Sequence, residues 1–293
     1  MNVQKVPFRV PENACDCHMH VFGPMDRYSL APMRAYTPPP ATHKDYIALA
    51  EPLGLRRFVV VQPSAYGTDN RCLLDTLDAC RNQARGIVVF DPSTIADHDI
   101  AAMHERGVCG VRVNLVSSST ALSSGVVASI RLLADRIAPF GWHLQFFVGL
   151  AQIAEMAPEL PTISVPVVFD HMGNARAELG TDQPGFATLV DLVASGQCWV
   201  KVSGAYHISN DPQYTDTGPI ARALIGANAD RIVWGTDWPH IGKTARRLER
   251  NPGIVPYRKI DDAGLLSLLG DWTDSDDVRR KILVDNPRAL YGF

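Results

Sequence analysis

The sequence contains no run of about 20 apolar residues, which is the length that a membrane-spanning helix needs. It also lacks an excess of basic charge, because 28 Lys and Arg stand against 31 Asp and Glu, for a net charge of −3. We therefore expect neither a membrane nor a nucleic acid as a partner. Residues 1–13 are too polar to form a signal peptide.

The six cysteines form no C-x-x-C pair and no regular framework. Cys15 and Cys17 lie two apart, but no second pair follows that could complete a metal cluster with them. In a chain of this length such usage predicts reduced thiols and a cytoplasmic protein.

The chain also lacks internal repeats, linkers and a glycine-rich phosphate loop after its first apolar segment. What it does contain is a series of short apolar runs that alternate with helix-like segments, several of them followed by glycine. This alternation predicts a (β/α)8 barrel formed by one domain, residues 1–293; the alternative, a doubly wound open sheet, would need the missing loop. The eight predicted strands are residues 14–21, 57–62, 86–91, 110–115, 142–148, 165–171, 198–204 and 231–237.

Polar residues gather at the carboxyl ends of these predicted strands. His18 and His20 are two apart, so their side chains share one face of the first strand. A closed barrel places the eighth strand beside the first, which brings Asp237 next to them, and His171 ends the sixth strand. Barrel enzymes carry their active sites at this end, so we predict that three imidazoles and one carboxylate form a hydrolytic centre.

Other polar side chains follow the same strand ends and are predicted to line the substrate pocket. Two long segments, residues 116–125 and 240–264, follow the fourth and eighth strands and are expected at the same face. The predicted pocket residues from these positions are Ser64, Tyr66, Asn114 and His240.

Seven stretches, in order along nearly the whole chain, resemble the amidohydrolase superfamily. More narrowly, they are similar to the amidohydrolase-2 branch, which includes 2-pyrone-4,6-dicarboxylate hydrolase and related lactonases. The resemblance implies a (β/α)8 barrel and the hydrolysis of a lactone, of the kind met in aromatic catabolism or sugar-acid metabolism. The stretches are HMHVFGP (18–24), VVVQPSAYGTDN (59–70), GVRVNL (110–115), VVFDHMGNA (167–175), WVKVSGAY (199–206), WGTDWPH (234–240) and NPRALYGF (286–293).

Many members of the superfamily bind one or two divalent metals through five side chains, and this sequence supplies four of them. The histidine pair of the first strand, His171 and Asp237 are present, but the fifth strand has Phe147 at the expected position, and His143 lies at that strand's beginning. No bridging lysine or glutamate appears on the fourth strand. The resemblance therefore implies no required metal, with one zinc held by His18, His20, His171 and Asp237 as the alternative.

The hypothesis for the mechanism is that the three histidines polarise a lactone carbonyl while Asp237 takes a proton from the attacking water. The resemblance implies Tyr36 and Arg112 as substrate-binding residues, with a salt bridge inside the barrel as the other possibility for Arg112. Ser118 and His207 occupy positions where the dicarboxylate enzyme has arginine. His207 is nevertheless expected in the pocket, which should favour a lactone with one carboxylate, or with hydroxyl groups.

Three other functions stay open at this stage. A decarboxylase of the same superfamily would need a metal, a lactone isomerase would leave the substrate's mass unchanged, and a non-catalytic barrel would bind ligand without turnover. The partner is expected to be a small lactone, and the sequence indicates no oligomeric state.

Overall fold

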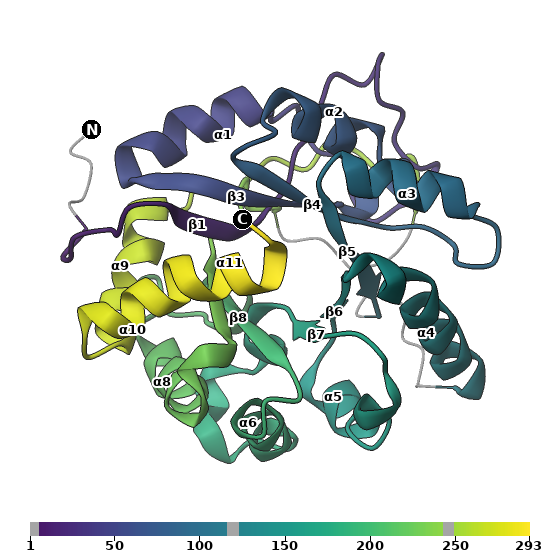
Figure 1. Ribbon diagram of the computed structural model, residues 1–293. Coiled ribbons are helices and arrows are strands. Elements are labelled where there is room, and N and C mark those ends of the chain that lie inside the picture. Colours follow the sequence, from purple (N-terminus) through teal and green to yellow (C-terminus); the bar gives the residue numbers. More distant parts are fainter. Residues whose placement is uncertain (1–5, 116–122, 243–248) are drawn as a thin grey trace.

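The computed structural model describes residues 6–115, 123–242 and 249–293. Eight parallel strands form one sheet in the order β1-β3-β4-β5-β6-β7-β8-β9, and it curls into a barrel with helices around it (Figure 1). The predicted (β/α)8 barrel is thus confirmed. The strands are β1 (Ala14–Met19), β3 (Leu55–Val61), β4 (Ala84–Val88), β5 (Val108–Asn114), β6 (His143–Phe147), β7 (Val167–Phe169), β8 (Trp199–Ser203) and β9 (Ile232–Gly235).

Helices α1 to α8 lie between successive barrel strands in the chain, as parallel connections require, and α9 to α11 follow the last strand. They are α1 (His43–Ala50), α2 (Arg71–Ala79), α3 (Asp97–Glu105), α4 (Ser124–Ile137), α5 (Leu150–Met156), α6 (Phe186–Ala194), α7 (Ala205–Ile208), α8 (Gly218–Ala227), α9 (Asp262–Trp272), α10 (Asp276–Arg280) and α11 (Asn286–Tyr291).

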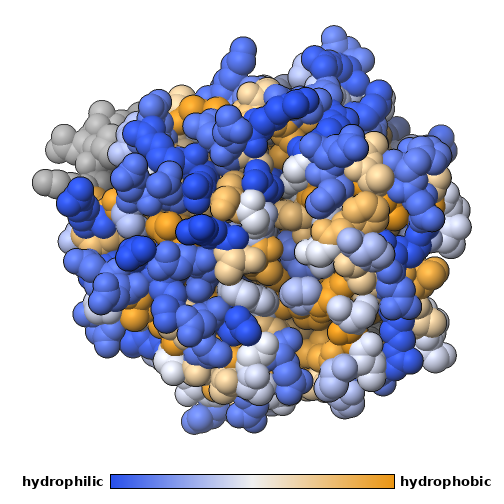
Figure 2. Space-filling view, in the orientation of Figure 1, coloured by the Kyte–Doolittle hydropathy of each residue, from blue (hydrophilic) through white to orange (hydrophobic). Residues whose placement is uncertain are grey.

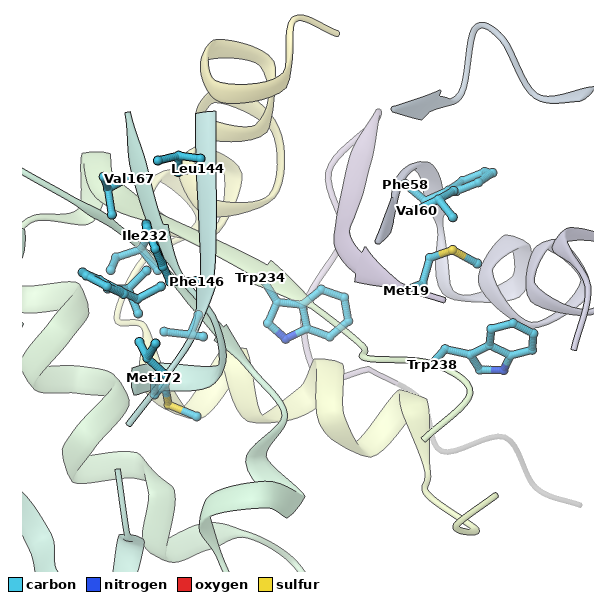
Figure 3. Close-up of a cluster of buried hydrophobic side chains, with 14 of the residues drawn as sticks. Met19, Phe58, Val60, Leu144, Phe146, Val167, Met172, Ile232, Trp234 and Trp238 are labelled. Atoms are coloured by element: carbon cyan, nitrogen blue, oxygen red, sulfur yellow. The ribbon is translucent and has the colours of Figure 1, made fainter. Parts of the chain in front are cut away.

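The strands are apolar on both faces because both faces are buried. On β3, Val59 and Val61 belong to the cluster inside the barrel, whereas Phe58 and Val60 belong to the outer core. The ring of Phe58 lies 5.0 Å from that of Tyr46 on α1. Figure 3 shows outer-core side chains of several strands, including Phe58, Val60 and Met19. This core fixes where each strand ends, and therefore where the polar side chains lie.

The barrel closes between β9 and β1 through a few specific hydrogen bonds. The amide of Asp237 donates to the carbonyl of His18 at 2.8 Å, and the amide of His20 donates to the carbonyl of Trp238 at 2.8 Å. The buried carboxylate of Asp16 accepts from the amides of His18 and Thr236, both at 3.0 Å. These bonds place the histidine pair against Asp237, as the closed topology predicted.

The opposite end of the barrel is filled by apolar side chains and by α11, which lies near the centre of the strands in Figure 1. Tyr291 of α11 packs with Cys15 and Cys17, and its ring lies 5.4 Å from that of His143. All six cysteines are free. His143 therefore lies at the end of the barrel away from Asp237, as expected from its place at the beginning of β6.

On the face seen in Figure 2, hydrophilic residues surround smaller apolar areas. Among the described residues, none of the helices has both the length and the apolar character to cross a membrane.

Two segments far apart in the sequence pair over the carboxyl ends of the strands. Strand β2 (Met33–Arg34) is antiparallel to β10 (Glu249–Arg250), and Thr37 forms a bridge with Ile254. The buried guanidinium of Arg34 donates to Thr37 Oγ1 and to Asn251 Oδ1. This pairing brings Tyr36, from the loop after β1, and Arg258, from the loop after β9, to the opening at the carboxyl ends of the strands.

Candidate active site

A cavity of about 370 Å³ opens at the carboxyl ends of the strands. This is the end where barrel enzymes place their chemistry. Phe147 and Tyr206 contribute apolar ring surface, and the loop after β9 contributes Arg258. Of the residues predicted from the sequence, those that line the cavity are His20, Tyr36, Ser64, Arg112, Asn114, His171, His207 and Asp237.

Asp237 is the centre of this site, because three imidazoles converge on its carboxylate. Its Oδ1 lies 3.5 Å from Nε2 of His18 and 3.3 Å from Nε2 of His20. Its Oδ2 lies 3.9 Å from Nε2 of His171. The structure therefore brings together the four residues that the sequence predicted as one centre.

Two further side chains, from α7, contact the same carboxylate. The hydroxyl of Tyr206 donates to Asp237 Oδ2 at 2.6 Å, and Nε2 of His207 lies 2.8 Å from the same oxygen. Burial raises the pKa of Asp237, but His171, His20 and His207 outweigh it and hold the pKa well below its usual value. The carboxylate is thus ionised and carries lone pairs that can accept a hydrogen bond or a proton.

The hydrogen bond on the far side of the ring defines the tautomer of His20, whereas Nδ1 of His18 has two polar neighbours. Nδ1 of His20 donates to the carbonyl of Val61 at 2.7 Å, so in the neutral ring Nε2 carries a lone pair that faces Asp237. Nδ1 of His18 lies 3.2 Å from Oδ1 of Asp170 and 3.4 Å from Nζ of Lys201. It donates to the carboxylate in one tautomer and accepts from the ammonium in the other, which places the ring hydrogen on Nε2. Burial lowers the pKa of His18 well below its usual value, although Asp170 acts in the opposite direction.

Asp170 is fully buried and holds several polar side chains inside the barrel. Its Oδ2 accepts from Nε of Arg112 at 3.3 Å and from Nε2 of Gln145 at 3.1 Å. Lys201, also fully buried, lies 3.7 Å from Oδ1 and donates to Gln145 Oε1 and to the carbonyl of Cys17. These cations, together with His18, keep the pKa of Asp170 well below its usual value despite the burial that raises it.

Arg112 lines the cavity and also forms the salt bridge inside the barrel that the sequence left open. Its guanidinium lines the cavity, lies 5.1 Å from the ring centre of Phe147, and is paired with Asp170 through Nε and Nη2, both at 3.3 Å. Because Asp170 already offsets its charge, Arg112 offers an incoming anion less than an unpaired arginine would.

The donor atoms at Asp237 fit a divalent metal ion. Nε2 of His18 is buried and has no hydrogen-bond partner among the described residues. Ligand atoms of His18, His171 and Asp237 lie within 4.8 Å of one another. Nitrogen lone pairs that face an ionised carboxylate repel it unless protons or a cation lie between them, and three nitrogens with one oxygen are a usual zinc set. Phe147 occupies the fifth ligand position, which leaves room for a single ion.

Two residues predicted for the pocket lie outside the cavity, so these predictions were wrong. The hydroxyl of Tyr66 accepts from the amide of Gly23 at 3.0 Å, and its ring stacks on Phe22. Nε2 of His240 lies 2.9 Å from Asp262 Oδ1, and the side chain is buried. Both side chains turn toward structural partners that the sequence does not reveal. Ser118 lies outside the described residues.

The sequence did not identify Asp170, Tyr206 or Arg258 as members of the site. Signals existed for two of them, because Asp170 directly precedes His171 and Tyr206 directly precedes His207. Arg258 carries no such signal, since it comes from the middle of a long loop.

Comparisons with known proteins show which family this chain resembles. A family model described as Amidohydrolase matches residues 15–293. A 4-sulfomuconolactone hydrolase of Hydrogenophaga intermedia is 36% identical over 99% of this chain and 92% of its own length. A 2-pyrone-4,6-dicarboxylate hydrolase of Comamonas testosteroni is 33% identical over 99% of this chain and 93% of its own. The crystal structure of a Pseudomonas putida protein assigned as a 2-pyrone-4,6-dicarboxylic acid hydrolase has a TM-score of 0.81 at 31% identity, covering 97% of this chain and 98% of that one.

Proposed function

We propose, from the premise that the chain belongs to the amidohydrolase family, that it is a hydrolase that opens the ring of a small lactone by adding water. The observation that carries this proposal is the buried, ionised carboxylate of Asp237, with imidazoles around it, at the base of a cavity that arginines also line. Both curated relatives described above are named as hydrolases, one of a lactone and one of a pyrone.

Asp237 is the general base in this proposal. A water molecule beside Asp237 gives its proton to the carboxylate while its oxygen bonds to the lactone carbonyl carbon, which becomes tetrahedral. The bond from that carbon to the ring oxygen then breaks, and Asp237 returns the proton to the departing oxygen. One water is consumed and a hydroxy acid is formed. Tyr206 and His207 hold the carboxylate in place through its Oδ2.

The carbonyl must be polarised for this step, and the tautomers decide which residue does so. His20 presents a lone pair and cannot donate to the carbonyl while neutral. Nδ1 of His171 lies 2.9 Å from the hydroxyl of Ser203. When that hydroxyl donates, Nε2 of His171 carries the hydrogen and donates to the carbonyl oxygen.

One divalent ion also fits this site, and we propose it in preference to a metal-free centre. His18, His20, His171 and Asp237 would hold it, with Nδ1 of His171 donating to Ser203 so that the lone pair of Nε2 is free to ligate. When bound, the ion would supply the charge that polarises the carbonyl in place of the His171 N–H, and it would acidify water. The observation that carries this proposal is the buried Nε2 of His18, which has no hydrogen-bond partner among the described residues, together with the ligand atoms of His18, His171 and Asp237 within 4.8 Å of one another.

The test is a panel of carboxylated, sulfonated and hydroxylated lactones, run with and without a chelator, followed by metal analysis of the protein. The proposal expects products heavier by one water, and activity that falls after chelation and returns with zinc. A product of unchanged mass would indicate an isomerase, and release of CO2 a decarboxylase; either result would overturn the proposal. Saturable binding with no turnover of any lactone would indicate a non-catalytic barrel.

The prediction of a cytoplasmic, reduced protein is part of the same proposal.

A further inference from the structure

The cations that line the cavity differ in how they are paired. The guanidinium of Arg112 is held by Asp170. Arg258 is half-buried, and within the described ranges no carboxylate lies within ion-pair distance of it. The segments outside those ranges, residues 1–5, 116–122 and 243–248, contain no Asp or Glu. Arg258 is therefore a cavity cation whose charge no acidic side chain offsets.

Arg258 is nevertheless held in a defined place. Its amide donates to the carbonyl of His240 at 2.8 Å, and its Nη1 donates to the carbonyl of Tyr206 at 3.0 Å. Its guanidinium carbon lies 4.6 Å from the ring centre of Tyr206. Stacking on an aromatic ring and one N–H bond keep the group oriented, while Nη2 and Nε have no hydrogen-bond partner among the described residues.

Tyr206 connects this cation to the reacting group. Its ring supports Arg258, and its hydroxyl bonds Asp237 Oδ2 at 2.6 Å. A ligand whose carbonyl lies at Asp237 therefore occupies the same cavity as Arg258, and both groups contact Tyr206. A charged substituent on the ring gives the arginine a partner in this cavity, whereas an unsubstituted lactone leaves it without one.

We propose that Arg258 is the specificity-determining residue that binds an oxyanion substituent of the lactone, either a carboxylate or a sulfonate. This inference rests on the proposed function. A guanidinium can donate two parallel N–H bonds to either oxyanion, because a carboxylate has two equivalent oxygens and a sulfonate has three.

The test measures binding of ring analogues that cannot be opened, so it does not depend on turnover. The probes are 3-oxocyclopentane-1-carboxylate, the corresponding 1-sulfonate and the neutral 1-carboxamide, titrated by calorimetry into wild type, Arg258→Met, Arg258→Lys and Arg250→Met. Arg250 is an exposed arginine of the same loop region and serves as the matched control. The comparison of the carboxylate with the sulfonate shows which oxyanion is preferred.

Wild type and Arg250→Met are expected to bind the two anions at least tenfold more tightly than the carboxamide. Arg258→Met should remove this preference while leaving carboxamide binding within about twofold, and Arg258→Lys should retain part of it, since lysine keeps the charge but not the fork. A merely structural role would weaken all three probes together. That result would overturn the assignment. So would an unchanged preference for the anions in Arg258→Met, or a wild type that does not prefer the anions.

The two proposals fail in different ways. A protein that shows the charge preference but opens no lactone would refute the hydrolase and leave the oxyanion site standing. A protein that opens neutral and anionic lactones equally well, in wild type and in Arg258→Met alike, would refute the oxyanion site and leave the hydrolase.

Discussion

The hydroxyl of Tyr206 donates a 2.6 Å hydrogen bond to Oδ2 of Asp237, the oxygen that also lies 2.8 Å from Nε2 of His207. The bond points the other carboxylate oxygen toward His18 and His20. The position of the proposed base thus depends on a phenol that the sequence analysis did not select.

Replacing Tyr206 with phenylalanine removes this bond and little volume. Because a hydrogen bond to a charged group contributes about 1.5–3 kcal/mol, we expect Tyr206→Phe to lower kcat about tenfold or more. Steady-state kinetics on the best lactone of the panel measures the effect. Tyr214→Phe, outside the cavity lining, should keep wild-type kcat, and an unchanged kcat in Tyr206→Phe would contradict the positioning role.

A second prediction concerns the closure of the barrel. The carboxylate of Asp16 accepts from the amides of His18 and Thr236 and from the hydroxyl of Tyr46 at 2.9 Å. Asp16→Ala leaves these buried donors unpaired, at about 1–3 kcal/mol for each. We expect the free energy of unfolding to fall by about 3 kcal/mol or more in urea titrations, whereas Asp182→Ala at an exposed position should change it by less than about 0.5 kcal/mol. Equal stability of the two variants would refute this role.

The two cavity arginines should behave differently when each is replaced by methionine. Arg112→Met breaks a buried pair and leaves Asp170 short of a cation, which we expect to cost about 3–5 kcal/mol of stability. Arg258→Met removes a stacked, half-buried cation without an acidic partner and should cost about 1 kcal/mol or less. Thermal and urea unfolding of both variants measures the contrast. Similar losses of stability in the two variants would contradict the pairing in the structure, where Asp170 pairs with Arg112 and no described acidic residue pairs with Arg258.

Metal content gives a prediction that does not require activity. Protein exposed to zinc and then desalted should retain about one ion per chain, because one set of three nitrogens and one carboxylate is present. His18→Asn should reduce this content, and the surface variant His98→Asn should not, since His98 is exposed and far from the site in the fold. Mass spectrometry of the dissolved metal provides the count. A wild type that retains no zinc would favour the metal-free centre.

The parts of the site that the sequence predicted are those that strand geometry determines. The parallel strands end at one face, and closure of the barrel places β1 on the side of β9 that β8 does not occupy, so His18, His20 and Asp237 had to meet. Continuous apolar runs identified the strands because both faces of each strand are buried.

The parts that could not be predicted depend on side-chain direction and on loops. Tyr66 follows β3 as Ser64 does, yet its hydroxyl turns to the amide of Gly23, and only Ser64 reaches the cavity. Arg258 reaches the cavity because β2 pairs with β10 across more than 200 positions. Neither contact leaves a periodic pattern in the sequence.

The measurement that tests the central claim most directly is lactone turnover by Asp237→Asn, compared with wild type and with Asp182→Asn as the matched change at an exposed position. The asparagine keeps the size of the side chain but cannot take the proton of water, so the account predicts a loss of kcat of about a thousandfold or more in a variant with wild-type circular dichroism. Asp182→Asn should keep wild-type turnover. An Asp237→Asn variant that opens the lactone within tenfold of the wild-type rate would contradict the account.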